Sequence, residues 1–325
     1  MNDTAAGTFL YLSGAEVEAL LPPPLDCANA VEAAFRALAT GGAASVPKNG
    51  FDVTPSTFFH AMPARYDARG EIGIKWIGTA LNAARGLPHI NAMIVLNDIE
   101  TAVVKAIMDG TAITAIRPAA VSLAAARKLA RPDSSRISFY PCGVQALANL
   151  EAFATSFPIR EVTCLSRRVE TAEAFAAQAR LRGFAAHVVT DPRRAVENQD
   201  IVVSSAPRAA DLVRIFDPAW LSPGAFVTGV DLGRAWQCRD LRQLELLATD
   251  NHAQSREAAA TGIIAWVGEY DADLSELASG AHPGRTSPEQ RAFFLHPGLG
   301  LGDVAIASQV LQRAIERNVG TRLQR

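Results

Sequence analysis

The sequence predicts an α/β protein in which a doubly wound, mostly parallel sheet is joined to an α+β N-terminal domain. Two observations support this fold class. Short Val- and Ile-rich segments alternate with helical segments from residue 137 onward, whereas residues 45–108 hold a series of strand-like runs. The 325 residues suffice for two domains. We expect the first domain at 1–118, completed by a C-terminal helix at about 304–325, and the second at 119–303.

Two helices should open the first domain. Ser13 and Glu16 have the spacing of a capping box, and the prolines at 22–24 should end that short helix. Asp26 is expected to start a second helix, which ends before Gly41. Four runs with strand character follow, at 57–62, 72–77, 90–96 and 103–108. They predict a mainly antiparallel sheet.

A helix over about 112–130 is expected to lead into the strands of the second domain. These strands are predicted at 137–140, 161–165, 186–190, 201–206, 225–230 and 245–249, with helices between the first three and another from about residue 255. Such alternation implies right-handed crossovers and parallel strands. At the end of the chain, Asp303 can cap a last helix with an apolar stripe, which we expect to return to the first domain.

The composition favours small-molecule partners. Lys plus Arg total 31 against 33 for Asp plus Glu, so the charge balance indicates no nucleic-acid partner. No apolar stretch reaches the roughly 20 residues of a bilayer span, and the N-terminus lacks a secretory pattern, so we expect a cytoplasmic protein without membrane contact. The cysteines lack C-x-x-C spacing and the histidines are dispersed, which predicts neither a disulfide framework nor a metal site.

The turn after the first parallel strand lies where a dinucleotide fingerprint would lie, because ligands bind at the carboxyl ends of such strands. Residues 141–146 read Pro-Cys-Gly-Val-Gln-Ala, which partly matches G-x-G-x-x-A. Gly143 can let the backbone approach a pyrophosphate, with Cys142, Val144 and Gln145 in the same turn. Pro141 replaces the first glycine, so a turn without a ligand is an equally good interpretation of this motif alone.

The next strand end carries Ser166, Arg167 and Arg168, about 20 residues further on, where NAD-binding proteins usually have an acidic residue. A hydroxyl and two guanidinium groups match a 2'-phosphate, because arginine binds phosphate bidentately. We therefore expect NADP(H) as the preferred cofactor and NAD(H) as the second choice. The competing interpretation is that the arginines only solvate the start of a helix.

Two later strand ends should face the nicotinamide. Ser204, Ser205 and Ala206 follow one strand, and Asp231 follows the next. A carboxylate there can move protons to and from an amine or imine nitrogen while hydride moves at the neighbouring carbon. An aspartate at a strand end is also a common turn residue, which is the alternative for Asp231.

The first domain supplies cations in an apolar setting: Lys48, Lys75 and Arg117. Lys75 lies inside a predicted strand, where burial is costly without an anion, and a substrate carboxylate would satisfy it. Alternation with Ile74 and Trp76 makes a solvent-facing Lys75 an equal alternative.

Several segments together resemble the ornithine cyclodeaminase and μ-crystallin family. The most specific is 108–117, Met-Asp-Gly-Thr-Ala-Ile-Thr-Ala-Ile-Arg; the others are 73–76, 86–88, 95–98, 142–146, 223–224 and 302–304. The resemblance implies a homodimer built through the N-terminal domain, a Rossmann-type domain, and a site between them for a small amino or imino acid. It also implies that Lys75 and Arg117 bind the substrate carboxylate, that Lys48 assists them, and that Asp231 is the acid/base.

The leading hypothesis is an NAD(P)H-dependent reductase or dehydrogenase of a small imino or amino acid, of the ketimine reductase type, with Asp231 and Lys75 as its catalytic residues. Members that cyclise ornithine carry Glu-Leu-Met-Pro where this chain has His60-Ala61-Met62-Pro63. His60 is therefore expected to line the side-chain pocket of a different substrate. The alternatives are a cyclodeaminase with tightly bound NAD, and a non-catalytic protein that binds a nucleotide or small ligand.

Overall fold

The computed structural model describes residues 7–54, 56–208, 213–264 and 266–325. The chain forms two compact units. Unit 1 comprises Met1–Arg117 and Leu299–Arg325, and unit 2 comprises Pro118–Gly298. The division falls inside one helix, α3 (Thr111–Leu129). Among the described residues, no helix is both long and apolar enough to cross a bilayer.

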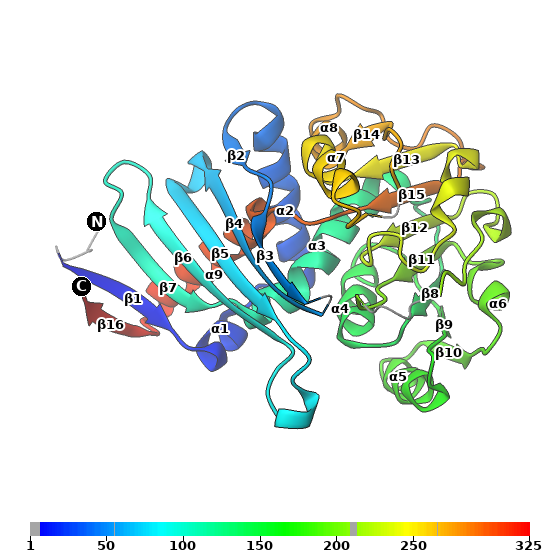
Figure 1. Ribbon diagram of the computed structural model, residues 1–325, viewed down its shortest axis with the longest axis horizontal. Helices are drawn as coiled ribbons and strands as arrows, with labels where there is room; N and C mark the ends of the chain where they lie inside the picture. Colours follow the sequence, from blue (N-terminus) through cyan, green and yellow to red (C-terminus); the bar gives the residue numbers. More distant parts are fainter. Residues whose placement is uncertain (1–6, 55, 209–212, 265) are drawn as a thin grey trace. The chain divides into compact units, whose positions relative to one another are not determined.

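Unit 1 is built on an eight-stranded sheet in the order β16-β1-β7-β6-β5-β4-β2, with β3 paired to β4 (Figure 1). All pairs are antiparallel except β1 with β7. The strands are β1 (Thr8–Leu12), β2 (Ala43–Ser45), β3 (Asn49–Thr54), β4 (Thr57–Tyr66), β5 (Glu71–Thr79), β6 (Ile90–Asp98), β7 (Val104–Asp109) and β16 (Thr321–Gln324). The four predicted runs correspond to β4 to β7, whereas the other four strands were not predicted.

Helices cover one face of this sheet. Figure 1 shows α9 (Gly300–Arg317) lying across it, with α2 (Pro24–Ala39) packed against α9. The short helix α1 (Gly14–Leu20) has the predicted capping box, in which the backbone N–H of Ser13 donates to Glu16 Oε2 at 2.8 Å. Helix α2 begins at Pro24 and not at Asp26, because proline has no N–H to leave unpaired in the first turn.

The prediction for the C-terminal helix was wrong at its start, and a strand that was not predicted follows the helix. Helix α9 has Leu299 at its N-cap, so Asp303 lies inside the first turn and does not cap the helix. The helix ends at Arg317, and β16 follows it and pairs with β1. The carboxylate of Asp303 is buried and binds Lys75, which lies 228 residues earlier in the chain. A local pattern of capping residues cannot reveal such a distant partner.

Unit 2 holds a parallel sheet in the order β10-β9-β8-β11-β12-β15-β13-β14. The strands are β8 (Arg136–Tyr140), β9 (Glu161–Cys164), β10 (Ala185–Val188), β11 (Ile201–Ser204), β12 (Phe226–Gly229), β13 (Leu246–Thr249), β14 (Ala272–Asp273) and β15 (Ala292–Leu295). The helices are α4 (Val144–Phe153), α5 (Val169–Leu181), α6 (Pro192–Val196), α7 (His252–Ala260) and α8 (Leu274–Ser279). The doubly wound sheet is confirmed; β14, β15, α6 and α8 were not predicted.

The strand order reverses at β8. The chain continues from β8 to β9 and β10 on one side and then returns to β11 and β12 on the other. A reversal of this kind leaves a crevice at the carboxyl ends of the two strands beside it, here β8 and β11. The turns that follow these strands are therefore the places where unit 2 can bind a ligand.

Gly300 lets α9 approach β4 closely, so a substitution at this position tests the packing of unit 1. A Cβ atom at this position would lie 2.3 Å from the carbonyl oxygen of Met62. Gly300→Ala should therefore lower the free energy of unfolding in urea by about 1–3 kcal/mol. The control is Gly42→Ala, whose new Cβ would lie 3.6 Å from the nearest atom, Ala37 Cβ, and should change stability by less than about 0.5 kcal/mol. Equal unfolding curves for the two variants would contradict this packing.

Candidate functional site

Lys75 is buried in unit 1 and belongs to an ion cluster. Its side chain is 0% exposed, whereas the next residue, Trp76, is 44% exposed on the opposite face of β5. The solvent-facing alternative is therefore wrong. Lys75 Nζ lies 2.6 Å from Asp303 Oδ1, so a protein carboxylate supplies the anion that the sequence had suggested a substrate would supply. Burial lowers the pKa of Lys75 to about 8, although Asp303 opposes that shift.

Arg117 binds the same carboxylate oxygen. Its Nε lies 3.4 Å from Asp303 Oδ1, and Asp303 is its one acidic partner among the described residues. Asp303 Oδ2 is buried and has no hydrogen-bond partner in the described part of the chain. Two cations therefore share one anion, which leaves one positive charge when all three groups are ionised. A buried cluster with this balance suits a ligand with one carboxylate.

Thr114 was missed by the sequence analysis. It lies three residues before Arg117 on α3, so both side chains project from the same face of that helix. It is buried, and its hydroxyl has no hydrogen-bond partner among the described residues. The Thr-x-x-Arg spacing was the signal that could have identified it.

Lys48 and His60 are half-buried residues near the same part of the sheet. Lys48 directly precedes β3, which pairs with β4. His60 pairs with Ile77 in the register of β4 with β5, two residues along from the pair of Met62 with Lys75. Paired residues project from the same face of a sheet. His60 therefore lies on the face that carries Lys75, and its assignment to the side-chain pocket stays a prediction.

In unit 2, the predicted nucleotide turn joins β8 to α4. The Tyr140–Pro141 peptide is cis, and Gly143 is the N-cap of α4. A Cβ atom on Gly143 would meet no atom within 4 Å, so the space beside its backbone is open. The backbone N–H of Cys142 donates to Ser166 Oγ at 2.9 Å, which ties the turn to the end of β9. The turn can thus take a phosphate at its glycine while its position is fixed by Ser166.

A cavity of about 700 Å³ lies beside this turn. Its lining includes five of the predicted cofactor residues, namely Gly143, Ser166, Arg167, Arg168 and Ala206, together with Tyr140, Pro141, Leu165, Thr171, Thr190, Pro192, Pro207, Val213 and Ile215. Neither Cys142, Val144, Gln145, Ser204 nor Ser205 is among the lining residues. The volume is in the range of ligand pockets, and the two arginines favour an anionic ligand. The residues present therefore fit a dinucleotide.

Asp231 follows β12 and is 1% exposed. Ser204 Oγ donates to Asp231 Oδ1 at 3.0 Å, and the backbone N–H of Gly233 donates to the same oxygen at 3.1 Å. The indole N–H of Trp236 donates to Ser204 Oγ at 3.0 Å. Asp231 Oδ2 is buried without a hydrogen-bond partner among the described residues. Burial raises the pKa of the Asp231 carboxyl, and the nearby Arg234 opposes this effect.

These hydrogen bonds give Ser204 a role that differs from the predicted one. The sequence placed Ser204 against the cofactor, but its hydroxyl is engaged with Asp231 and Trp236. Trp236 was not singled out in the sequence. It is fully buried, and its ring packs on Phe216 and Phe293 with centroids 5.0 and 5.1 Å away. A rigid aromatic core thus fixes the Ser204 hydroxyl, which in turn orients one oxygen of Asp231.

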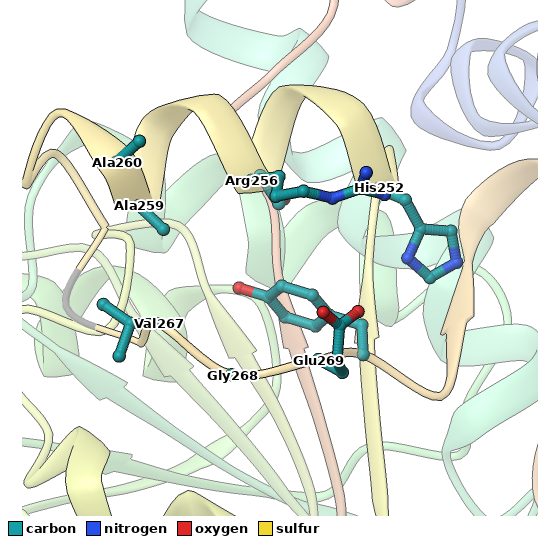
Figure 2. A pocket seen from close by; sticks show the side chains of 9 residues that line it. His252, Arg256, Ala259, Ala260, Val267, Gly268 and Glu269 are labelled. Carbon is teal, nitrogen blue, oxygen red and sulfur yellow. The ribbon is translucent and has the colours of Figure 1, made fainter.

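A second cavity of unit 2 has a volume of about 230 Å³. Figure 2 shows His252 and Arg256 of α7 on one side of it and Glu269 on the other. None of the residues predicted from the sequence is among its lining residues. We therefore do not assign it to the candidate site.

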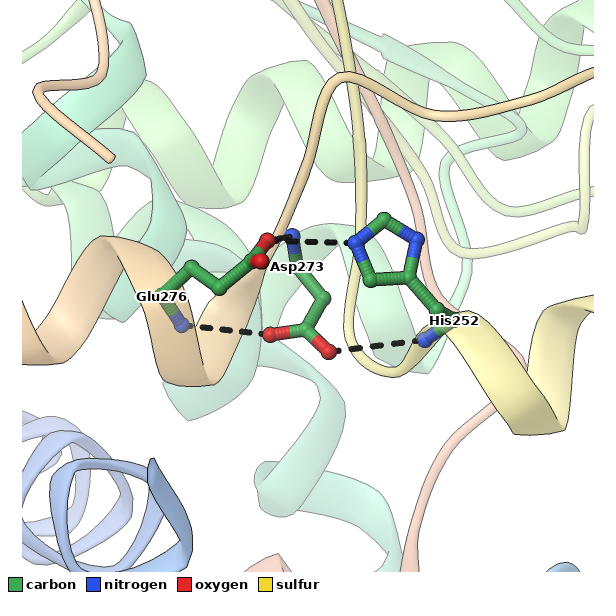
Figure 3. Close-up of side chains that lie close together, drawn as sticks. All are labelled: His252, Asp273 and Glu276. Atoms are coloured by element: carbon green, nitrogen blue, oxygen red, sulfur yellow. Dashed lines mark hydrogen bonds and ion pairs between the residues drawn. The ribbon is translucent and has the colours of Figure 1, made fainter. Parts of the chain in front are cut away.

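Three possible metal ligands lie near this second cavity. Donor atoms of His252, Asp273 and Glu276 lie within 4.8 Å of one another. As Figure 3 shows, however, these groups bind each other and the backbone. Asp273 Oδ1 accepts the backbone N–H of Glu276 at 3.1 Å, Glu276 Oε2 accepts that of Asp273 at 2.8 Å, and His252 Nε2 lies 3.1 Å from Glu276 Oε2. The capping box of α8 accounts for the cluster.

The doubly wound sheet, the cavity at its reversal point and the buried carboxyl beside it are features of dinucleotide-dependent enzymes. Residues 10–318 match the model of the ornithine cyclodeaminase/mu-crystallin family, and the chain belongs to this family. The resemblance seen in the sequence is thereby confirmed. The relatives of this chain include an alanine dehydrogenase, a Δ1-pyrroline-2-carboxylate reductase and an uncharacterised cyclodeaminase, which supports an enzymatic function.

Known proteins resemble this chain over almost its full length. An alanine dehydrogenase of Archaeoglobus fulgidus is 32% identical, and the match covers 97% of this chain and 98% of that protein. An archaeal alanine dehydrogenase solved as a dimer with bound NAD has a TM-score of 0.88 at 30% identity, covering 98% and 99% of the two chains. The Δ1-pyrroline-2-carboxylate reductase of Thermococcus litoralis, solved with NADH and L-proline, has a TM-score of 0.85 at 26% identity, covering 96% and 99%.

The raised pKa of Asp231 predicts a pH-dependent stability difference. A carboxyl whose pKa is higher in the folded state favours folding below its ordinary pKa, near 3.9, and this advantage is lost as the pH rises through the folded value. Asp231→Asn does not titrate and retains an oxygen for Ser204. Its free energy of unfolding in urea should therefore rise relative to that of the wild-type protein as the pH increases from about 4. A difference that does not change with pH would contradict the raised pKa.

Proposed function

We propose that this protein is an NAD(P)H-dependent reductase or dehydrogenase of a small imino or amino acid, of the ketimine reductase type. The observation that carries the proposal is the state of Asp231. One carboxyl oxygen is held by two donors, the other has no hydrogen-bond partner among the described residues, and burial raises the pKa of the group. A buried carboxyl with these properties is suited to giving a proton to an imine nitrogen and taking it back from an amine.

The roles that we propose for the cations of unit 1 follow from their positive charge. Lys75 and Arg117 would hold the substrate carboxylate, with Lys48 assisting and His60 beside the substrate side chain. When bound, the nicotinamide would supply hydride to the imine carbon. Asp231 would give the proton to the nitrogen and be held in place by Ser204 and Gly233. The relative solved with NADH and L-proline supports a substrate of the cyclic imino acid class.

NADP(H) is the preferred cofactor in this proposal, with NAD(H) as the second choice. Support comes from Ser166, Arg167 and Arg168, which line the larger cavity and offer donors for a 2'-phosphate. The two solved relatives contain NAD or NADH. The arginine pair is the feature of this chain that favours the phosphorylated form.

A homodimer is also part of the proposal. The sheet of unit 1 carries exposed apolar side chains on the face opposite Lys75, among them Phe51 at 70%, Phe59 at 37% and Trp76 at 44% exposure. The rings of Phe59 and Trp76 stack with centroids 5.9 Å apart. Apolar patches of this kind mark interfaces. The archaeal alanine dehydrogenase was solved as a dimer. A cytoplasmic location for this protein remains a prediction from its sequence.

The second candidate is a cyclodeaminase, which the family description and an uncharacterised cyclodeaminase relative support. Such an enzyme would release ammonia from ornithine or lysine without net consumption of cofactor. The sequence His60-Ala61-Met62-Pro63 speaks against it, since it lacks the glutamate of members that cyclise ornithine.

An assay of NADPH and NADH oxidation separates the candidates. Purified protein is supplied with pyrroline and piperideine carboxylates, and with 2-oxo acids plus ammonia or methylamine. We expect turnover of at least one imine. Asp231→Asn should reduce kcat about 100- to 10,000-fold without loss of nucleotide binding, whereas the control Asp240→Asn, at a half-buried aspartate of the same unit, should not reduce kcat. Ammonia release from ornithine with no imine reduction would favour the cyclodeaminase, and binding without any turnover would refute both.

The cofactor preference has its own test. Arg167→Ala together with Arg168→Ala should raise the KM for NADPH at least about tenfold, because charge-assisted hydrogen bonds to the 2'-phosphate are lost. The KM for NADH should change little. Arg193→Ala, which removes an exposed arginine paired with Glu197, serves as the control. An equal effect on both nucleotides would exclude a 2'-phosphate site at these arginines.

A further inference from the structure

Asp303 is a buried charged group that does not cap α9, as the sequence had predicted, and that has no role in the proposed mechanism. It lies in the first turn of α9, its side chain is 0% exposed, and α9 packs on β4 and β5. Asp303 Oδ1 contacts both cations that the proposed function assigns to the substrate carboxylate, Lys75 at 2.6 Å and Arg117 at 3.4 Å. A carboxylate in this position competes with the substrate for the same donors, so its presence requires an explanation.

We propose that Asp303 is a positioning residue that holds Lys75 and Arg117 around a single carboxylate position and leaves the pair one net positive charge. This inference rests on the proposed function and deepens it, because it limits the anionic part of the substrate to one carboxylate.

The charge balance gives the first argument. Without Asp303, two cations would face each other in a water-excluded space, and the lysine would lose its proton more easily because burial disfavours its charged form. Asp303 opposes both effects. With it, the cluster carries one positive charge, and one substrate carboxylate makes the cluster neutral. A second carboxylate at the same place would be a buried charge without a partner, which is costly.

The geometry gives the second argument. Only one oxygen of Asp303 is used, and it is used by both cations. The Nζ of Lys75 has three donors and the guanidinium of Arg117 has five, so each retains donors after binding Asp303. The unpartnered hydroxyl of Thr114 lies one helical turn from Arg117. The arrangement therefore offers donors from β5 and α3 to an anion, while α9 fixes where those donors lie.

Few other groups can influence the titration of Lys75. Its neighbours in the sheet, Met62 and Ile94, do not titrate. On the same face, β4 carries His60, and β5 carries Glu71, which is bound by Lys105 and Ser308. The charged groups that act on Lys75 are Asp303 from α9 and Arg117 from α3. A pH dependence that changes with residue 303 therefore reports on this cluster.

The test measures kcat/KM for Δ1-pyrroline-2-carboxylate between about pH 6 and pH 10, with the nucleotide saturating. Wild-type protein should lose kcat/KM above about pH 8, where Lys75 deprotonates. Asp303→Asn should move this alkaline limb to lower pH by at least about one unit, which lowers kcat/KM about tenfold above the limb. Well below the limb kcat should stay within about threefold of wild type, because Asp303 does not touch the reacting atoms.

Lys75→Arg is the matched control, because a guanidinium does not lose its proton in this range. The part of the alkaline loss that comes from Lys75 should disappear in this variant, any loss from deprotonation of Asp231 should remain, and adding Asp303→Asn to the variant should produce no pH shift. A uniform loss of activity at all pH values in Asp303→Asn, or the same pH shift in the Lys75→Arg background, would overturn the inference. Either result would mean that Asp303 only stabilises the fold.

Asp303→Glu provides a second variant if Asp303→Asn does not fold. It keeps the charge but moves the carboxylate by one methylene, so the alkaline limb should remain while KM rises severalfold. An unchanged KM would overturn the positioning role. Calorimetric binding of pyrrole-2-carboxylate gives a readout without turnover. If the wild-type protein reduces no imine but binds this probe with the expected dependence on residue 303, the proposed function fails and the role of Asp303 stands. If the wild-type protein is active but its binding of the probe does not depend on residue 303, the proposed function stands and the role of Asp303 fails.

Discussion

The ion pair of Lys75 with Asp303 is the constraint on which unit 1 depends. A lysine with no exposed surface has to be matched by an anion, and the chain supplies it from α9, 228 residues further on. The sheet face that carries Lys75 must therefore be covered by α9 with Gly300 against β4 and Asp303 over β5. The exposed apolar side chains of β3, β4 and β5 lie on the other face, so burial and charge divide the sheet into two sides with different roles.

In unit 2, neutral hydrogen-bond donors stabilise a second buried carboxyl group. Asp231 is also buried, but hydrogen bonds from Ser204 and a backbone N–H hold one of its oxygens, and Arg234 acts on it only as a nearby charge. The groups that surround Asp303 and Asp231 therefore differ in charge. Asp303 is bound by two full charges, whereas Asp231 is held by neutral donors and burial raises the pKa of its carboxyl group. The contrast explains why one suits proton transfer and the other suits the placement of cations.

Much of the fold could be predicted from the sequence because its signals are local. Hydrophobic alternation located β4 to β7, and the succession of short apolar runs with helices located most of the parallel sheet. The failures involve partners distant in the chain. Strands β1 and β16 pair with each other and lack a turn signal, and Asp303 looks like a helix cap until Lys75 is placed beside it. Trp236 was missed because its role comes from the indole N–H that it donates to Ser204 Oγ, a partner that only the packed structure reveals. Thr114, in contrast, had a local signal in its spacing from Arg117.

Because α9 and β16 belong to unit 1, the order of synthesis affects the order in which the two units can fold. Residues 118–298 of unit 2 are complete when about nine-tenths of the chain has left the ribosome, and they need no later segment for their sheet. Unit 1 has to wait, because the strand partner of β1 and the counter-charge of Lys75 are synthesised last. Until α9 has been made, the chain lacks the helix and the carboxylate that cover and pair with Lys75 in the folded protein. The part of the molecule that is translated first is thus the part that finishes folding last.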